Sequence, residues 1–171
     1  ALTIDGKRIE EYACTCELLK TSGHEIEGIG TFCHEFSHVL GLRDAYNTVT
    51  SKKLLGKWDL MESGSYLNNS RTPCSYSAFE RYSIGWLNLT DIDTPAEMEL
   101  PELNSSNTAY RIRTDRPCEF FTLENRQQQG WDAYHPGKGL MIMHIDFDEK
   151  AWRTNTVNNG SHPRYDLVEA D

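Results

Sequence analysis

The sequence lacks any hydrophobic run that approaches the roughly 20 residues needed to cross a bilayer, so we expect no membrane span. It also lacks clusters of Lys and Arg, and its formal net charge is −9. Because binding to nucleic-acid phosphates depends on clustered positive charge, this composition argues against nucleic acid as a partner. What remains is a globular chain of 171 residues, and its 38% hydrophobic content is sufficient for a real core.

The sequence also lacks an initiator methionine and a basic-then-apolar leader, because it begins Ala1-Leu2-Thr3. We therefore expect that any secretion signal is removed or lies upstream of this sequence. The cysteines number five, so they cannot all pair within the chain, and Cys14 and Cys16 do not have the C-x₂-C spacing of a zinc ribbon. The cysteines therefore predict no particular disulfide pairing.

The stretch around His34 and His38 predicts a helix with two different faces. At about 100° per residue, His34 and His38 lie close together on one face. Two imidazoles one turn apart can bind a single Zn²⁺, and Glu35 then lies beside the ion without having to bind it. The opposite face is apolar and is expected to pack against the rest of the protein, through Ile29, Phe32, Phe36, Val39 and Leu40.

The residues after this helix suggest a third ligand. Gly41 has no Cβ, so it can take the left-handed conformation that ends a helix and turn the chain back. Asp44, three residues later, would then reach the same ion. The alternative is an amphipathic helix in which the two histidines have this spacing by chance. The glycine and the aspartate at fixed distances after the second histidine favour a metal site instead. With three protein ligands, the fourth position stays open, which is typical of a catalytic zinc site.

The run HEFSHVLGLRDAY resembles the HExxHxxGxxD signature of the immune inhibitor A family, metzincin-like zinc peptidases secreted by bacteria. The resemblance implies that His34, His38 and Asp44 bind zinc and that Glu35 is the general base. Further similarity to the family is carried by the phrases GWL, FFTLENRQ, GWDAYHPGKGLMIMHID and DLVEAD. Together these segments extend the resemblance from about residue 26 onward.

The run WDLMESGSY resembles the Met-turn of the same family. By this resemblance, Met61 forms an apolar floor beneath the metal site and does not bind the ion, whereas a methionine in isolation is most simply a core residue. Tyr66 is a candidate for stabilising the oxyanion, although packing explains a tyrosine in this loop equally well.

The periodicities predict an α+β fold. Short strands are expected at 7–19, 110–113, 119–124 and 139–146. The resemblance implies that the strand at 7–19, which precedes the active-site helix, pairs with an extended substrate. A helix ending near Gly85 is expected to bury an aromatic stripe formed by Tyr76, Phe79, Tyr82 and Trp86.

The resemblance and the pattern of elements together imply two regions. Residues 1–90 are expected to form a zincin-like catalytic unit with an active-site helix and a Met-turn, truncated at its N-terminal side. Residues 91–171 are expected to form a loop-rich crossing and a β-rich segment that continues beyond the fragment.

Oxygen-bearing side chains in the second region raise the question of a Ca²⁺ site. Asp146, Asp148, Glu149 and Asn155 carry closely spaced oxygen atoms that suit Ca²⁺, but they lack the D-x-[DN]-x-[DN]-G loop. A solvated acidic loop is the favoured interpretation. Likewise, His144 is interpreted as one face of a strand rather than as part of a second metal site.

These observations predict a zinc-dependent endopeptidase that acts on a protein or peptide substrate, with Glu35 as general base. One alternative is a catalytically inactive metal-containing binding or adhesion module. Another is a zinc hydrolase with a non-peptide substrate. A secreted, cell-surface or periplasmic location in a bacterium is expected, and the sequence indicates nothing about the oligomeric state.

Overall fold

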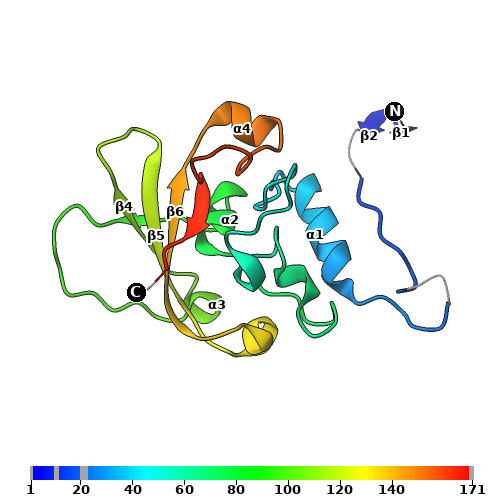
Figure 1. Ribbon diagram of the computed structural model, residues 1–171, viewed down its shortest axis with the longest axis horizontal. Helices are drawn as coiled ribbons and strands as arrows, with labels where there is room; N and C mark the ends of the chain where they lie inside the picture. The colour runs from blue at the N-terminus through cyan, green and yellow to red at the C-terminus, as the bar shows by residue number, and fades with distance from the viewer. Residues whose placement is uncertain (1, 10–11, 20–22, 170–171) are drawn as a thin grey trace.

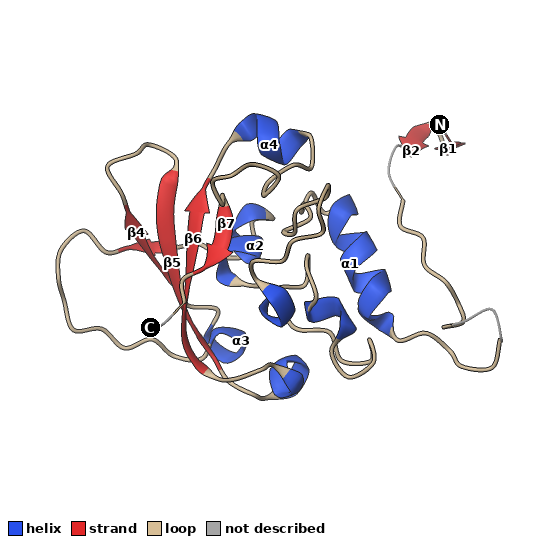
Figure 2. Ribbon diagram, viewed as in Figure 1, coloured by secondary structure: helices blue, strands red, loops and turns tan. Residues whose placement is uncertain are grey.

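The computed structural model describes residues 2–9, 12–19 and 23–169 and has the α+β architecture expected (Figure 1). Figure 2 shows a twisted sheet on one side, the long helix α1 on the other, and short helices and loops between them. In chain order the elements are β1 (Leu2–Ile4), β2 (Lys7–Ile9), α1 (Ile29–Val39), η1 (Gly56–Trp58), η2 (Gly64–Tyr66), α2 (Ala78–Ser83), β3 (Thr90–Asp91), α3 (Leu103–Ser106), β4 (Tyr110–Arg113), β5 (Glu119–Arg126), η3 (Gly130–Tyr134), β6 (Gly139–Asp146), α4 (Glu149–Arg153) and β7 (Tyr165–Leu167).

The main sheet has the strand order β3-β4-β5-β6-β7. β3 pairs with β4 in parallel, and all the other neighbours are antiparallel. Along β5 every second residue is buried, which is the alternation that a sheet covered on one face produces. The strands predicted at 110–113, 119–124 and 139–146 are confirmed as β4, β5 and β6.

Helix α2 begins with a capping box. The Ser77 side chain accepts from the Glu80 amide, and the Glu80 carboxylate accepts from the Ser77 amide, so two unpaired helix donors are satisfied. Gly85 follows the helix with φ +78°, as the predicted helix end requires. Phe79 is buried, but Trp86 is 56% exposed, so the prediction that the whole aromatic stripe is core was wrong for Trp86 and for Tyr82, which is 39% exposed.

The expected packing of α1 is also wrong in part. Ile29, Phe32 and Phe36 are all more than two-fifths exposed, whereas the buried residues of the helix are the small Gly30 and Ser37. The reason is that α1 approaches the loop around η2 so closely that only small side chains fit between them. The aromatic side chains therefore lie on the opposite side, where Phe32 and Phe36 stack with ring centroids 5.8 Å apart.

The strand predicted at 7–19 is wrong for most of its length. β2 ends at Ile9 and pairs only with β1, in a two-stranded hairpin that Figure 1 shows apart from the main body. Residues 12–19 contain no strand, although Leu18 forms an isolated bridge with Ile26. Residues 10 and 11 lie outside the described residues. Tyr12, Cys14 and Cys16 alternate as the face of a strand would, but they are exposed and pair with no strand among the described residues, so the pattern alone does not make a sheet strand.

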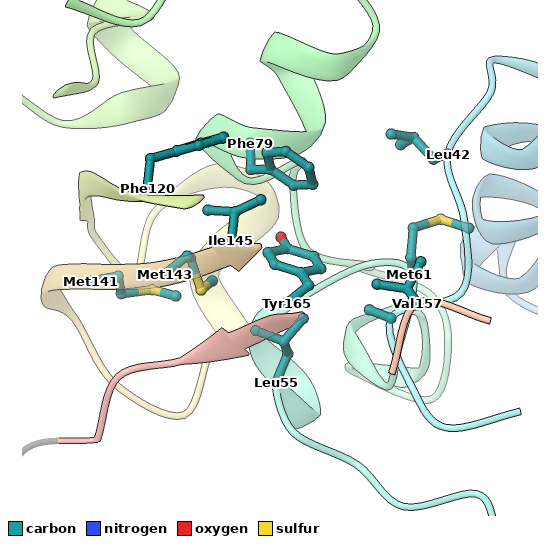
Figure 3. Packing of buried hydrophobic residues seen from close by; sticks show 11 residues of the cluster. Leu42, Leu55, Met61, Phe79, Phe120, Met141, Met143, Ile145, Val157 and Tyr165 are labelled. Carbon is teal, nitrogen blue, oxygen red and sulfur yellow. The ribbon is translucent and has the colours of Figure 1, made fainter. Parts of the chain in front are cut away.

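The main core draws on both halves of the chain. Figure 3 shows Tyr165 of β7 beside Phe79 of α2, with Met61 and Val157 packed nearby. The full cluster of buried residues is Leu42, Ala45, Leu55, Met61, Phe79, Phe120, Met141, Met143, Ile145, Val157 and Tyr165. The division into residues 1–90 and 91–171 stays a prediction, but the two stretches share this core.

No helix formed by the described residues has both the length and the apolar character that crossing a membrane requires. The five cysteines all lie within the described part of the chain and are unpaired.

Candidate metal centre

Helix α1 places two imidazoles side by side. His34 and His38 are one turn apart, and their ring centroids are separated by 5.0 Å with the ring planes nearly perpendicular. Both rings are partly buried, with side-chain exposures of 12% and 27%. The pair therefore faces a sheltered space that solvent still reaches.

The turn after α1 brings a carboxylate to the same point. Gly41 has φ +103°, a conformation that residues with a Cβ rarely adopt, and the Leu42 amide donates to the Ser37 carbonyl as the chain reverses. Asp44 Oδ1 consequently lies 3.1 Å from His34 Nε2 and 3.4 Å from His38 Nε2. Among the described residues, these three are the group of ligand atoms that lie close enough together to hold a metal ion. The structure thus brings together the residues that the sequence singled out.

The hydrogen bonds of the two histidines indicate which ring nitrogens are free to bind a metal ion. His34 Nδ1 is 3.0 Å from the Leu60 carbonyl oxygen, and His38 Nδ1 is 3.0 Å from the Leu42 carbonyl oxygen. Because a carbonyl only accepts, each Nδ1 carries its hydrogen, and in the neutral ring Nε2 is a lone pair. Two nitrogen lone pairs and a carboxylate oxygen then point at one another, an arrangement that only a cation stabilises. This donor set of two imidazoles and one carboxylate fits Zn²⁺.

Without a metal, protons take the place of the cation. Burial alone would lower the pKa of His34, but hydrogen bonds to Asp44 and to the Leu60 carbonyl raise that pKa above its ordinary value. The hydrogen bond to Asp44 likewise raises the pKa of His38. Burial acts to raise the pKa of Asp44, yet its hydrogen bonds to both histidines and to Asn155 hold that pKa well below the usual range.

Asn155 fixes the outer side of Asp44. Its Nδ2 donates to Asp44 Oδ2 at 2.6 Å, and its Oδ1 accepts from the Asp44 amide at 2.8 Å. Asp44 Oδ1 is thereby left for the two histidines. Sequence reasoning placed Asn155 among candidate Ca²⁺ ligands and missed this role, because 111 residues separate the partners and no local spacing signals the contact.

Two of the other candidate Ca²⁺ ligands pair with cations of the chain. Asp146 pairs with Arg164 and His162, and Asp148 pairs with Arg164 and also caps helix α4 through the Ala151 amide. His144 lies on one face of β6, as predicted, between the carboxylates of Asp166 and Glu119.

Glu35 lies at the edge of an open cavity of about 290 Å³ that also includes His34 in its wall. Two tyrosines line the same cavity. Tyr66, the residue predicted from sequence, is 60% exposed there. Tyr46 is less exposed, and burial together with the negative charge of the nearby Asp44 raises the pKa of Tyr46. Sequence reasoning did not single out Tyr46, although its position two residues after Asp44 was a usable signal.

Met61 is joined by its backbone to the segment that carries Asp44. It is 1% exposed, its amide donates to Asp59 Oδ1, and its carbonyl accepts from the Ala45 amide, so the turn is tied to the segment that carries Asp44. The preceding Leu60 supplies the carbonyl that orients His34. That Met61 forms an apolar floor beneath the metal site stays a prediction.

The family model described as "Immune inhibitor A peptidase M6, catalytic domain" matches residues 20–89. This segment belongs to the immune inhibitor A peptidases. It contains His34, His38, Asp44 and Met61, so the immune inhibitor A segment holds the whole polar cluster but not Asn155. No curated protein and no solved structure matches the chain in the corresponding comparisons.

Proposed function

We propose that the protein is a zinc-dependent endopeptidase in which His34, His38 and Asp44 bind the ion. The observation that carries the proposal is the convergence of two imidazole Nε2 atoms and one carboxylate oxygen, while both Nδ1 atoms are held by backbone carbonyl oxygens. The membership of residues 20–89 in a peptidase family supports a peptide substrate. When bound, zinc supplies a Lewis acid that lowers the pKa of water toward about 7 and stabilises negative charge on a carbonyl oxygen.

The residues of the chain supply the proton transfers. Glu35, in the wall of the cavity beside His34, accepts the proton from the attacking water and then gives it to the leaving amine. Tyr46 and Tyr66 face the same cavity, so either hydroxyl can donate to the developing oxyanion. Met61 supports the ligands by packing, in the manner of a Met-turn. A secreted or cell-surface location stays a prediction.

The test of this function is Glu35→Gln. The substitution keeps the size of the side chain but removes the base, so we expect a loss of peptidase activity of at least about a hundredfold with zinc still bound in a one-to-one ratio. Activity is measured on a denatured protein substrate with and without chelator, and zinc is measured by elemental analysis.

His38→Ala is the matched comparison, because it should lose the metal and the activity together. Peptidase activity at the wild-type level in Glu35→Gln would overturn the role of Glu35. Absence of metal-dependent hydrolysis in the wild-type protein would favour an inactive binding module, and hydrolysis of esters but not of peptides would favour a different zinc hydrolase.

A further inference from the structure

A second concave surface includes Gly41 and Arg43, in the turn that leads to Asp44. It is a groove of about 770 Å³, and it has no lining residue in common with the cavity at Glu35. The groove is bordered by the end of α2, by β4, by α4 and by the turn after α1. It is therefore not part of the proposed catalytic site.

The floor of this groove is aromatic. Phe79 and Trp152 meet with ring centroids 6.0 Å apart, and Trp152 continues to Phe147 at 4.9 Å. Phe147 and Tyr82 are about two-fifths exposed, so the floor is open to a ligand. Such a surface buries an apolar or aromatic side chain favourably.

The rim of the groove is basic. Arg43, Arg111, Arg113 and Arg153 all line it, and Glu149 is the acidic residue among them. Asp91 pairs with Arg111 and Arg113, so it neutralises part of this charge. This concentration is unusual for the protein, which has 17 basic and 26 acidic residues in total.

Two of the four guanidinium groups have no counterion among the described residues. The side chains of Arg43 and Arg153 form no hydrogen bond or ion pair with any residue in the ranges 2–9, 12–19 and 23–169. Arg43 is half-buried, so water solvates its positive charge only in part. A guanidinium offers a planar pair of N–H donors that matches a carboxylate, and a carboxylate bound there would also be shielded from water on the aromatic side.

We propose that this groove binds an acidic peptide segment that carries an aromatic side chain. Carboxylates pair with Arg43 and Arg153 on the rim, and the aromatic ring lies on Trp152 and Phe147. A nucleic acid fits less well, because its evenly spaced phosphates need an extended basic surface and the protein as a whole has a net charge of −9. The groove thus takes a partner of opposite charge to its own rim and of the same charge as the whole protein.

The test uses a fluorescein-labelled peptide, Glu-Glu-Phe-Glu-Glu with blocked ends, and measures binding by fluorescence anisotropy while mass spectrometry checks that the peptide stays intact. Arg153→Gln and Arg43→Gln should each weaken binding about tenfold. Arg71→Gln removes an exposed arginine that pairs with Glu25 instead, and it should leave binding within about twofold of wild type. Thermal unfolding confirms that each variant is folded.

A second readout is independent of the arginines. Cys118 is exposed and lines the groove, whereas Cys14 and Cys16 are exposed elsewhere. Bound peptide should slow the alkylation of Cys118 at least about fivefold relative to the other two thiols. Equal binding of a Gln-Gln-Phe-Gln-Gln peptide, an equal effect of Arg71→Gln, or unchanged alkylation of Cys118 would each overturn the proposal. Displacement of the peptide by a single-stranded DNA 12-mer at equal concentration would replace it with a general polyanion surface.

Discussion

Asp44 is held from two directions, and this arrangement sets what each of its oxygens can do. The histidines of α1 approach Oδ1, and Asn155 occupies Oδ2 and the backbone amide. A ligand whose second oxygen is hydrogen-bonded has a fixed orientation, so less conformational entropy is lost when the ion binds. At the scale of single residues, Asn155 is therefore expected to tune metal affinity without touching the metal.

Asn155→Ala tests this expectation. Removing the carboxamide frees Asp44 to rotate, and the loss of such an outer contact typically weakens metal binding by about 10- to 100-fold. Asn159→Ala is a matched control, because Asn159 belongs to the same loop and binds Thr48 instead of Asp44. Zinc affinity is measured by competition with a chromogenic chelator. Equal affinities in the two variants would show that Asp44 is oriented without Asn155.

The sequence predicted which polar side chains meet, but it did not predict the residue that orients Asp44. His34, Glu35 and His38 lie within one helical turn, and Asp44 follows a glycine that permits the reversal, so local spacing was enough to bring them together. Asn155 could not be found in this way, since its contact depends on how α4 docks in three dimensions. Local motifs report the side chains on one element, and tertiary packing decides which distant residues meet them.

At the scale of elements, the position of α1 depends on close backbone approach rather than on apolar side chains. The Gly30 amide donates to the Ser70 carbonyl at 2.7 Å. A Cβ added at Gly30 would lie 1.8 Å from the Ser65 carbonyl oxygen. The helix that carries two of the proposed ligands can therefore lie where it does because its first turn has a residue without a side chain.

Gly30→Ala makes this dependence measurable. In a helix that packs loosely, alanine in place of glycine adds about 0.5–1 kcal/mol of stability. Here the clash with Ser65 must displace the helix, so we expect a net loss of roughly 1–3 kcal/mol in the free energy of unfolding by urea. Gly160→Ala is the control, because its added Cβ would meet no atom closer than 3.9 Å. A Gly30→Ala protein as stable as Gly160→Ala would contradict the close approach.

The elements themselves were predictable to different degrees. β5 and β6 are long and alternate between buried and half-buried residues, so their sequences predicted them directly. β7 has only three residues and is a strand because it pairs with β6. A sequence pattern does not reveal such a pairing. For α1, the apolar pattern predicted the helix correctly but not the buried face, because an apolar stripe does not show that small residues permit closer packing.

At the scale of the whole molecule, a buried polar network joins the two halves of the chain. Arg126 is completely buried and pairs with Glu124 and Asp132. Close by, Tyr165 donates to Asp59 and also hydrogen-bonds Ser77, which links the β-rich half to the turn before Met61. More carboxylates than cations are buried here, so ionising all of them is unfavourable.

Asp59 shows most clearly that ionising a buried carboxyl group costs free energy. Burial raises its pKa to about 7, although hydrogen bonds from Tyr165 and from the Met61 amide act in the opposite direction. The unfolded chain releases this proton near pH 3.9. Between these two values the folded state binds more protons than the unfolded state, so the stabilising contribution of the protonated carboxyl is lost as the pH rises from about 4 to about 7.

Asp59→Asn replaces the carboxyl with a neutral group of similar shape and removes this titration. In chelator, between pH 5 and pH 8, we expect the wild-type protein to lose on the order of 2 kcal/mol of unfolding free energy relative to the variant. The exposed Asp115, changed to Asn, should follow the wild type at both pH values. Urea unfolding gives both differences. A constant gap between wild type and Asp59→Asn across this range would mean that Asp59 is ionised throughout, and Tyr165 would then be donating to a permanent buried charge rather than to a carboxyl that holds its proton.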